Sequence, residues 1–130
     1  MKRIYTISDA ARATGVSISA LKKWINREII HQIGNQQSEK WTRFNKRDIA
    51  ILELTRVISN HGFTIKDACT IAYNFSSMQC YKEAMEHDLF WVIENNGDYV
   101  MDKWQLHERL SNTAIVLRPK RILEIAWAKL

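Results

Sequence analysis

The chain has 130 residues, of which 46% are hydrophobic and 25% charged, and its net charge is +5 at pH 7. These proportions are typical of one compact globular domain or of a small domain with an appendage, and no apolar run approaches the roughly 18 residues of a membrane span. The sequence from Met1 to Tyr5 becomes polar too early for a secretory signal peptide. We therefore expect a cytoplasmic, nucleoid-associated protein with no membrane partner.

The basic charge is concentrated in the first half of the chain. Residues 1–62 contain 11 Lys and Arg against 5 Asp and Glu, whereas residues 63–130 contain 8 against 9. This asymmetry indicates a module that binds a polyanion, joined to an electrically neutral module with a different role.

Three helix starts share one pattern, in which a capping side chain is followed three residues later by a carboxylate that the helix dipole favours. The pairs are Thr6 with Asp9, Asn45 with Asp48, and Thr64 with Asp67.

The first helix is predicted over residues 7–14, and Gly15 is expected to end it in a left-handed conformation. Val16 would fill the tight turn that follows, and Ser17 would cap a second helix. The inward residues of the first helix are expected to be Ile7, Ala10 and Ala11. Those of the second helix are expected to be Ile18, Leu21, Trp24 or Ile25, and Ile29.

The opposite side of the second helix carries side chains suited to reading DNA. Lys and Arg suit guanine edges or phosphates, Asn suits adenine, and Ser adapts to either. A solvated polar face is the alternative interpretation. The candidate DNA-binding residues here are Ser17, Ser19, Lys22, Lys23, Asn26 and Arg27.

A hairpin is predicted next, with strands over residues 29–33 and 41–44 and a polar loop over residues 34–40. Such a wing would reach phosphates or an adjacent minor groove, unless it is an ordinary surface loop. Its candidate DNA contacts are Gln36, Gln37, Lys40 and Arg43.

A long helix over about residues 46–60 is apolar over a wide arc, so we expect it to lie at the centre of the core. Gly62 would stop this helix, Phe63 would pack at the corner, and Thr64 would start another helix.

Two stretches, YTISDAARATGVSISALKKWI and WTRFNKRDIAILELTRVISNHGFTIKDA, resemble the DNA-binding domain of MerR-type regulators over roughly residues 4–72. The resemblance implies a winged helix-turn-helix that docks its second helix in the major groove and its wing on the backbone. The positions in register are Tyr5-Thr6-Ile7, Gly15-Val16-Ser17, Leu21, Arg43-Phe44, Asp48 and Gly62-Phe63-Thr64.

The chain departs from that family in three places. Glu28 stands where the family usually has Gly, and Lys23-Trp24 where it often has a tyrosine pair. Residues 74–88 offer only a short helix in place of the family's long dimerisation helix. The resemblance therefore does not extend to the family's usual dimer or to its DNA-untwisting activation.

From residue 89 the hydrophobic period becomes two, which predicts strands over residues 89–94 and 99–104 around an Asn-Gly turn. A third strand is expected over residues 114–117, and Pro119 would start a terminal helix that runs to Leu130. The predicted class is α+β. A DNA-binding domain would cover residues 1–75, and a small sheet-and-helix unit residues 76–130.

This second unit is small for independent stability, so it should pack on the first half or on a second copy of itself. We favour self-association into a homodimer, because Trp91, Trp104 and Trp127 supply large aromatic surface. A purely intramolecular core is the alternative.

Other chemistry finds little support. Cys80, Glu83 and His87 share a helix face but lack further ligands, so no metal site is expected. Cys69 and Cys80 are read as reduced thiols in or near the core. Without a phosphate loop, nucleophile elbow or zinc-protease motif, we expect no enzyme, no catalytic residue and no cofactor. The sequence does not say whether a small-molecule effector exists.

Three functions remain as hypotheses. The first is a bacterial or phage transcriptional regulator that binds double-stranded DNA at a palindromic operator as a dimer, since one short helix touches few base pairs. The second is an excisionase-like accessory factor of a phage or plasmid that binds tandem sites and bends DNA. The third is an adaptor that binds another protein.

Overall fold

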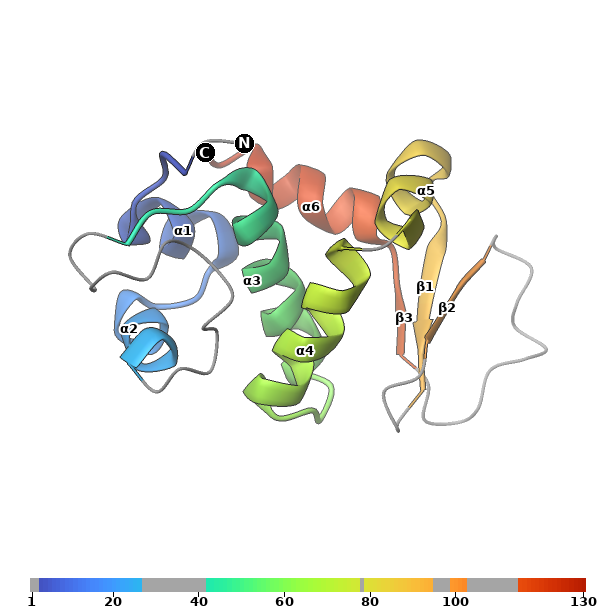
Figure 1. The fold of residues 1–130 in the computed structure, drawn as a ribbon, viewed down its shortest axis with the longest axis horizontal. Helices are drawn as coiled ribbons and strands as arrows, with labels where there is room; N and C mark the ends of the chain where they lie inside the picture. Colours follow the sequence, from blue (N-terminus) through green and yellow to red (C-terminus); the bar gives the residue numbers. More distant parts are fainter. Residues whose placement is uncertain (1–2, 27–41, 78, 95–98, 103–114) are drawn as a thin grey trace.

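The computed structural model describes residues 3–26, 42–77, 79–94, 99–102 and 115–130. Five helices precede the first strand in the described chain. They are α1 (Ile7–Thr14), α2 (Ile18–Asn26), α3 (Lys46–Ser59), α4 (Ile65–Ser76) and α5 (Gln79–His87). The strands β1 (Phe90–Ile93), β2 (Tyr99–Asp102) and β3 (Ile115–Leu117) follow, and α6 (Pro119–Trp127) ends the described order. The α+β class, with a helical first half and a small antiparallel sheet before a terminal helix, is confirmed (Figure 1).

The helix starts form as their capping residues predict. At α1, the Thr6 hydroxyl accepts a hydrogen bond from the Asp9 N–H, and the Asp9 carboxylate accepts one from the Thr6 N–H. This backbone hydrogen bond, with further help from Arg12, lowers the pKa of Asp9. Asn45 and Asp48 form the same reciprocal pair at α3. The reciprocal bonds satisfy backbone donors that a helix start otherwise leaves unpaired.

The centre of the molecule is α3, which packs against α1, α4 and α6 (Figure 1). Every residue from Asp48 to Thr55 is buried. Because eight successive residues cover all sides of a helix, the buried residues of α3 do not form a single apolar stripe. One hydrophobic cluster runs from Ala10 in α1 through α3 to Trp91 in β1 and Leu123 in α6. The prediction of a central core helix is confirmed, although α3 ends at Ser59 rather than Asn60.

The sheet has the order β2-β1-β3, and both pairings are antiparallel. Phe90 lies opposite Asp102 and Ile93 opposite Tyr99. The two strands thus form the predicted antiparallel pair, but the register is shifted by one residue from that of a two-residue Asn-Gly turn, which would place Ile93 opposite Val100. Trp91 is fully buried, and its ring stacks on Phe75 of α4 with 4.2 Å between ring centroids. The described strands are shorter than predicted, and the hairpin turn lies outside the described residues.

Helix α6 returns from the sheet to the first half of the chain, along the top of Figure 1. Arg12 Nε donates to the Lys129 carbonyl at 3.1 Å, and Trp127 Nε1 donates to the Lys46 carbonyl at 3.1 Å. Leu123 and Ala126 are fully buried on the same helix. The second half thus packs on the first half within one chain. The division near residue 75 stays a prediction.

Three local predictions were wrong. Ile18, the first residue of α2, is 40% exposed rather than inward, and the core side of this helix is formed by Leu21, Trp24 and Ile25. Thr42 and Arg43 form no described strand; Phe44 instead makes an isolated antiparallel bridge with Tyr5. The terminal helix ends at Trp127, and residues 128–129 turn before Leu130.

Candidate nucleic-acid interface

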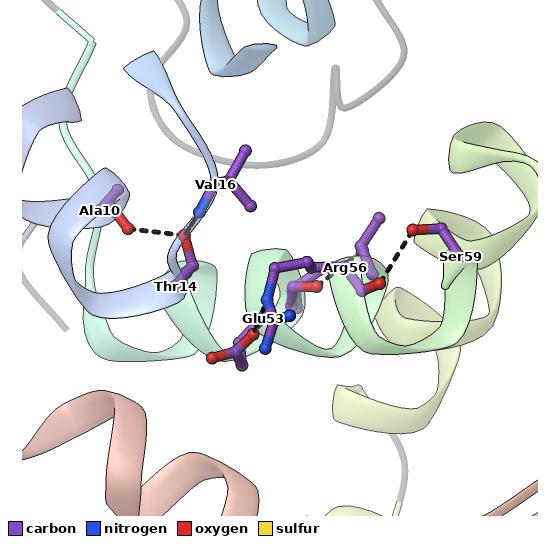
Figure 2. A network of polar contacts seen from close by, with 8 residues as sticks. Ala10, Thr14, Val16, Glu53, Arg56 and Ser59 are labelled. Atoms are coloured by element: carbon purple, nitrogen blue, oxygen red, sulfur yellow. Dashed lines mark hydrogen bonds and ion pairs between the residues drawn. The ribbon is translucent and has the colours of Figure 1, made fainter. Parts of the chain in front are cut away.

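The turn between α1 and α2 is held by a buried hydroxyl. Gly15 has φ +73°, the left-handed conformation that favours glycine. The Thr14 hydroxyl donates to the Ala10 carbonyl at 2.8 Å and accepts from the Val16 N–H at 3.2 Å, as Figure 2 shows. Thr14 is 2% exposed and Val16 is also buried. These hydrogen bonds therefore hold Val16 against the end of α1 in a buried environment, where they are stronger than in water.

One side of α2 anchors the helix on the core. Ser17 accepts a hydrogen bond from the Ala20 N–H at 3.1 Å, which confirms its predicted role as the cap. Leu21 is fully buried, and Trp24 and Ile25 are nearly so. The sequence left open whether Trp24 or Ile25 faces the core, and both side chains do. This anchor leaves the opposite side of α2 free of the core.

The opposite side carries the candidate DNA-reading side chains. Ser17, Ser19, Lys22 and Lys23 are all exposed. At about 100° per residue, positions 18, 19, 22, 23 and 26 fall on one half of the helix, away from Leu21, Trp24 and Ile25. Asn26 is the last residue of α2. Arg27, Gln36, Gln37 and Lys40 lie outside the described residues, as do residues 29–41 of the predicted wing.

Arg43 is the one candidate wing residue that the structure describes. Its side chain is half-buried, and Nη1 donates to the Thr42 carbonyl at 3.0 Å. Directly after it, Phe44 and Tyr5 exchange two backbone hydrogen bonds of 2.8 and 2.9 Å. This bridge joins the segment before α3 to the segment before α1. The position of Arg43 is therefore fixed relative to the helix-turn-helix.

Buried carboxylates support this region from α3. Asp48 is 4% exposed and accepts from both the Asn45 N–H and Arg3 Nε, each at 3.0 Å. Glu53 is 5% exposed and pairs with Arg56 Nε at 2.6 Å, one turn further along the helix (Figure 2). Both carboxylates are paired, as burial of a charge requires. The helical spacing of apolar residues does not predict that Glu53 is buried, because glutamate is most often solvent-exposed.

Helix α4 contains a buried cysteine, Cys69. Burial raises the pKa of the Cys69 thiol to about 11, so this cysteine is unreactive near neutral pH. The described part of the chain contains no cluster of three or more His, Cys, Asp or Glu side chains that could hold a metal. Within the same residues, no helix is long and apolar enough to cross a membrane.

Sequence reasoning missed one exposed residue on the candidate surface. The helical spacing of apolar residues assigned Ile18 to the buried side of α2, yet it is exposed beside Ser17 and Ser19. Its position provides the signal: it is the first residue of the helix and lies one turn before Lys22 on the same face.

The comparisons with known proteins agree with this geometry. A family model described as "MerR HTH family regulatory protein" matches residues 5–73, which is more than half of the chain and includes α1 to α3 and most of α4. A search of curated proteins gives no match. The matched family consists of DNA-binding regulators and not of enzymes. The chain therefore belongs to the MerR family of helix-turn-helix DNA-binding regulators.

Proposed function

We propose that this protein is a sequence-specific transcription regulator that binds a palindromic operator as a homodimer, with α2 of each protomer in the major groove. The observation that carries the proposal is the two-sided character of α2. Its inner side is anchored by Leu21, Trp24 and Ile25, while Ser19 and Lys22 on its outer side are exposed. A rigidly held helix with polar and cationic side chains outward fits the major groove.

Lys22 and Asn26 are assigned to base edges, because they are four residues apart in the sequence of α2 and this spacing favours one helix face. Lys40 and Arg43 are assigned to the backbone, together with Gln36 and Gln37 of the wing. Replacing Lys22 or Asn26 by Ala should cost about 1–3 kcal/mol of binding free energy and change base preference. Replacing Lys40 or Arg43 should weaken binding to all sequences alike and lower the salt dependence. Equal behaviour of all four variants would contradict these roles.

Dimerisation is assigned to the sheet end of the molecule. Helix α5 has nine residues, fewer than the three to four heptads of a coiled coil, so it cannot reproduce the family's long dimerisation helix. The sheet lies at the opposite end of the long axis from α2 (Figure 1). An interface at that end would leave both copies of α2 free to reach DNA.

The test is selection of binding sites from random double-stranded DNA, followed by mass measurement of the complex formed on the selected site. We expect a palindrome and two chains per DNA duplex. A single unpaired half-site bound by one chain would contradict the dimer. Tandem sites on bent DNA would favour an accessory factor in recombination, and no salt-dependent affinity for DNA would favour a protein-binding adaptor.

A further inference from the structure

Ile18 is exposed at a place where the proposed DNA-reading surface is otherwise polar. Four large apolar side chains are strongly exposed in the described part of the chain: Ile4, Ile18, Val116 and Ile125. Of these, only Ile18 lies on α2, and 40% of it is accessible. Its neighbours Ser17 and Ser19 are exposed as well, so Ile18 stands between two hydroxyl side chains at the start of the helix.

The position of Ile18 matches the part of a recognition helix that approaches base edges. In helix-turn-helix proteins, the N-terminal residues of the second helix contact the bases. Ile18 is the first residue of α2, and Lys22 follows one turn later on the same face, with Cβ atoms about 5–6 Å apart on an α-helix. Stacked base pairs are about 3.4 Å apart, so the two side chains would meet base pairs one or two steps apart.

The chemistry of Ile18 restricts what it can recognise there. An aliphatic side chain offers no hydrogen bond, and the one apolar group on the floor of the major groove is the C5-methyl of thymine. Lys23, which is exposed on the same helix, supplies positive charge that holds the helix against the phosphates, which an isolated isoleucine cannot do.

We propose that Ile18 is a specificity-determining residue that packs against the methyl group of a thymine in the operator. This inference rests on the proposed function, because it requires α2 in the major groove. It adds an apolar contact to a set of readers that are otherwise all polar or cationic. The contact makes the protein prefer thymine at one position of each half-site, next to the position that Lys22 reads.

The experiment replaces the thymines of the selected operator, one at a time, by deoxyuridine, which differs only in lacking the methyl group. Affinities for the thymine and uracil operators are compared within one protein variant. The ratio then cancels any change in the fraction of folded protein. At one thymine per half-site, loss of the methyl group should weaken binding of the unmodified protein about three- to fivefold, as expected for burial of one methyl group.

The variant Ile18→Ala should bind the thymine and uracil operators equally well at that position. Ile18→Val, which shortens the side chain by one terminal carbon, should retain part of the preference. Lys22→Ala is the matched control on the same helix face: it should bind both operators more weakly but keep the thymine-to-uracil ratio of the unmodified protein.

The outcomes separate this inference from the proposed function. Specific binding with a flat uracil scan, or a methyl preference that persists in Ile18→Ala, would overturn the role of Ile18 and leave the regulator proposal intact. If no sequence is selected from random DNA, both the regulator proposal and the role of Ile18 are overturned together.

Discussion

At the scale of single residues, three buried polar side chains of the helical half have their hydrogen bonds satisfied within the fold. Thr14 closes the turn before α2, and Asp48 joins the start of α3 to Arg3. Glu53 is paired with Arg56 inside the helical half. Each of these groups is desolvated and hydrogen-bonded, so a displaced helix would leave it unpaired at substantial cost. They make the helix-turn-helix rigid before it meets DNA.

Thr14→Val tests the turn directly. Valine has nearly the same shape but cannot accept the hydrogen bond from the buried Val16 N–H. We expect a loss of about 1–3 kcal/mol in the free energy of unfolding, measured by urea denaturation. Thr70→Val is the matched control, because Thr70 makes the same kind of hydroxyl bond to the Lys66 carbonyl on an exposed helix face. Its change should stay within about 0.5 kcal/mol, and equal losses at both sites would contradict the role of Thr14.

Cys69 predicts a pH dependence of stability. Burial raises the pKa of its thiol from the ordinary value of 9.0 to about 11, with Thr55 partly opposing the shift. The unfolded chain therefore releases this proton first as the pH rises. The stabilisation is fully present below pH 9 and is lost progressively between pH 9 and about 11.

The comparison is between the unmodified protein and Cys69→Ala, because other groups that titrate in this range cancel in the difference. The advantage of the unmodified protein in unfolding free energy should shrink by roughly 2–3 kcal/mol from pH 8 to pH 11, measured by denaturation at each pH. A constant difference across this range would show that the thiol ionises as easily in the folded as in the unfolded chain.

At the scale of elements, α6 joins the two ends of the molecule. One residue, Arg118, separates it from β3, and it packs on α3 and α1 (Figure 1). The Lys129 carbonyl, just after α6, accepts a hydrogen bond from Arg12 of α1. The ion pair between Arg118 and Asp88, which lowers the pKa of Asp88, holds the start of α6 against the end of α5. The sheet unit is thus connected to the helical half through α6 as well as through the stacking of Trp91 on Phe75.

Leu123→Ala measures how much the fold depends on this helix. Leu123 is fully buried against the shared core, so its truncation should cost about 2–5 kcal/mol of unfolding free energy. Ile125→Ala, two residues further along α6, removes a side chain that is 51% exposed and should change stability by about 0.5 kcal/mol or less. The two variants are compared by thermal and urea unfolding.

Because α6 packs on α1 and α3, Leu123→Ala should lower the protection of amide hydrogens in α3 as well as in α6. A loss of protection confined to α6 and the sheet would show that the two halves unfold as separate units.

At the scale of the whole molecule, the distribution of charge and the arrangement of the elements both favour the end that carries α2 as the DNA-binding end. The basic excess lies in residues 1–62, and α2 lies at the end of the long axis opposite the sheet (Figure 1). Electrostatic attraction to a polyanion is therefore strongest at the end that carries the proposed DNA-reading helix. The neutral sheet end is left for contacts that do not compete with DNA.

Salt dependence measures this arrangement. The affinity of the protein for duplex DNA should fall steeply with salt, and Lys23→Ala should lower the slope of the log–log plot by about 0.9, the value for one phosphate contact. Lys82→Ala is the control, because Lys82 is equally exposed but lies on α5. Fluorescence anisotropy over a salt series gives both slopes, and an equal loss for Lys82→Ala would show that charge anywhere on the chain suffices.

Most of the local structure was determined by the sequence alone. The capping pairs at Thr6 and Asn45, the left-handed Gly15 and the antiparallel pairing of β1 with β2 depend on residues close to one another in the sequence, so they can be predicted without the rest of the fold. The outward side of α2 and the resemblance to MerR-type regulators follow from such local patterns too, and the family match confirms the latter.

Only the tertiary structure decided how distant segments meet. Periodicity cannot show that Ile18 is left uncovered, that Phe44 bridges to Tyr5, or that Glu53 is buried, because each depends on where another element lies. The packing of α6 on α1 and α3 joins residues about 80 to 117 positions apart. Such contacts form because several amphipathic faces must cover one shared core, and no single segment encodes which faces meet.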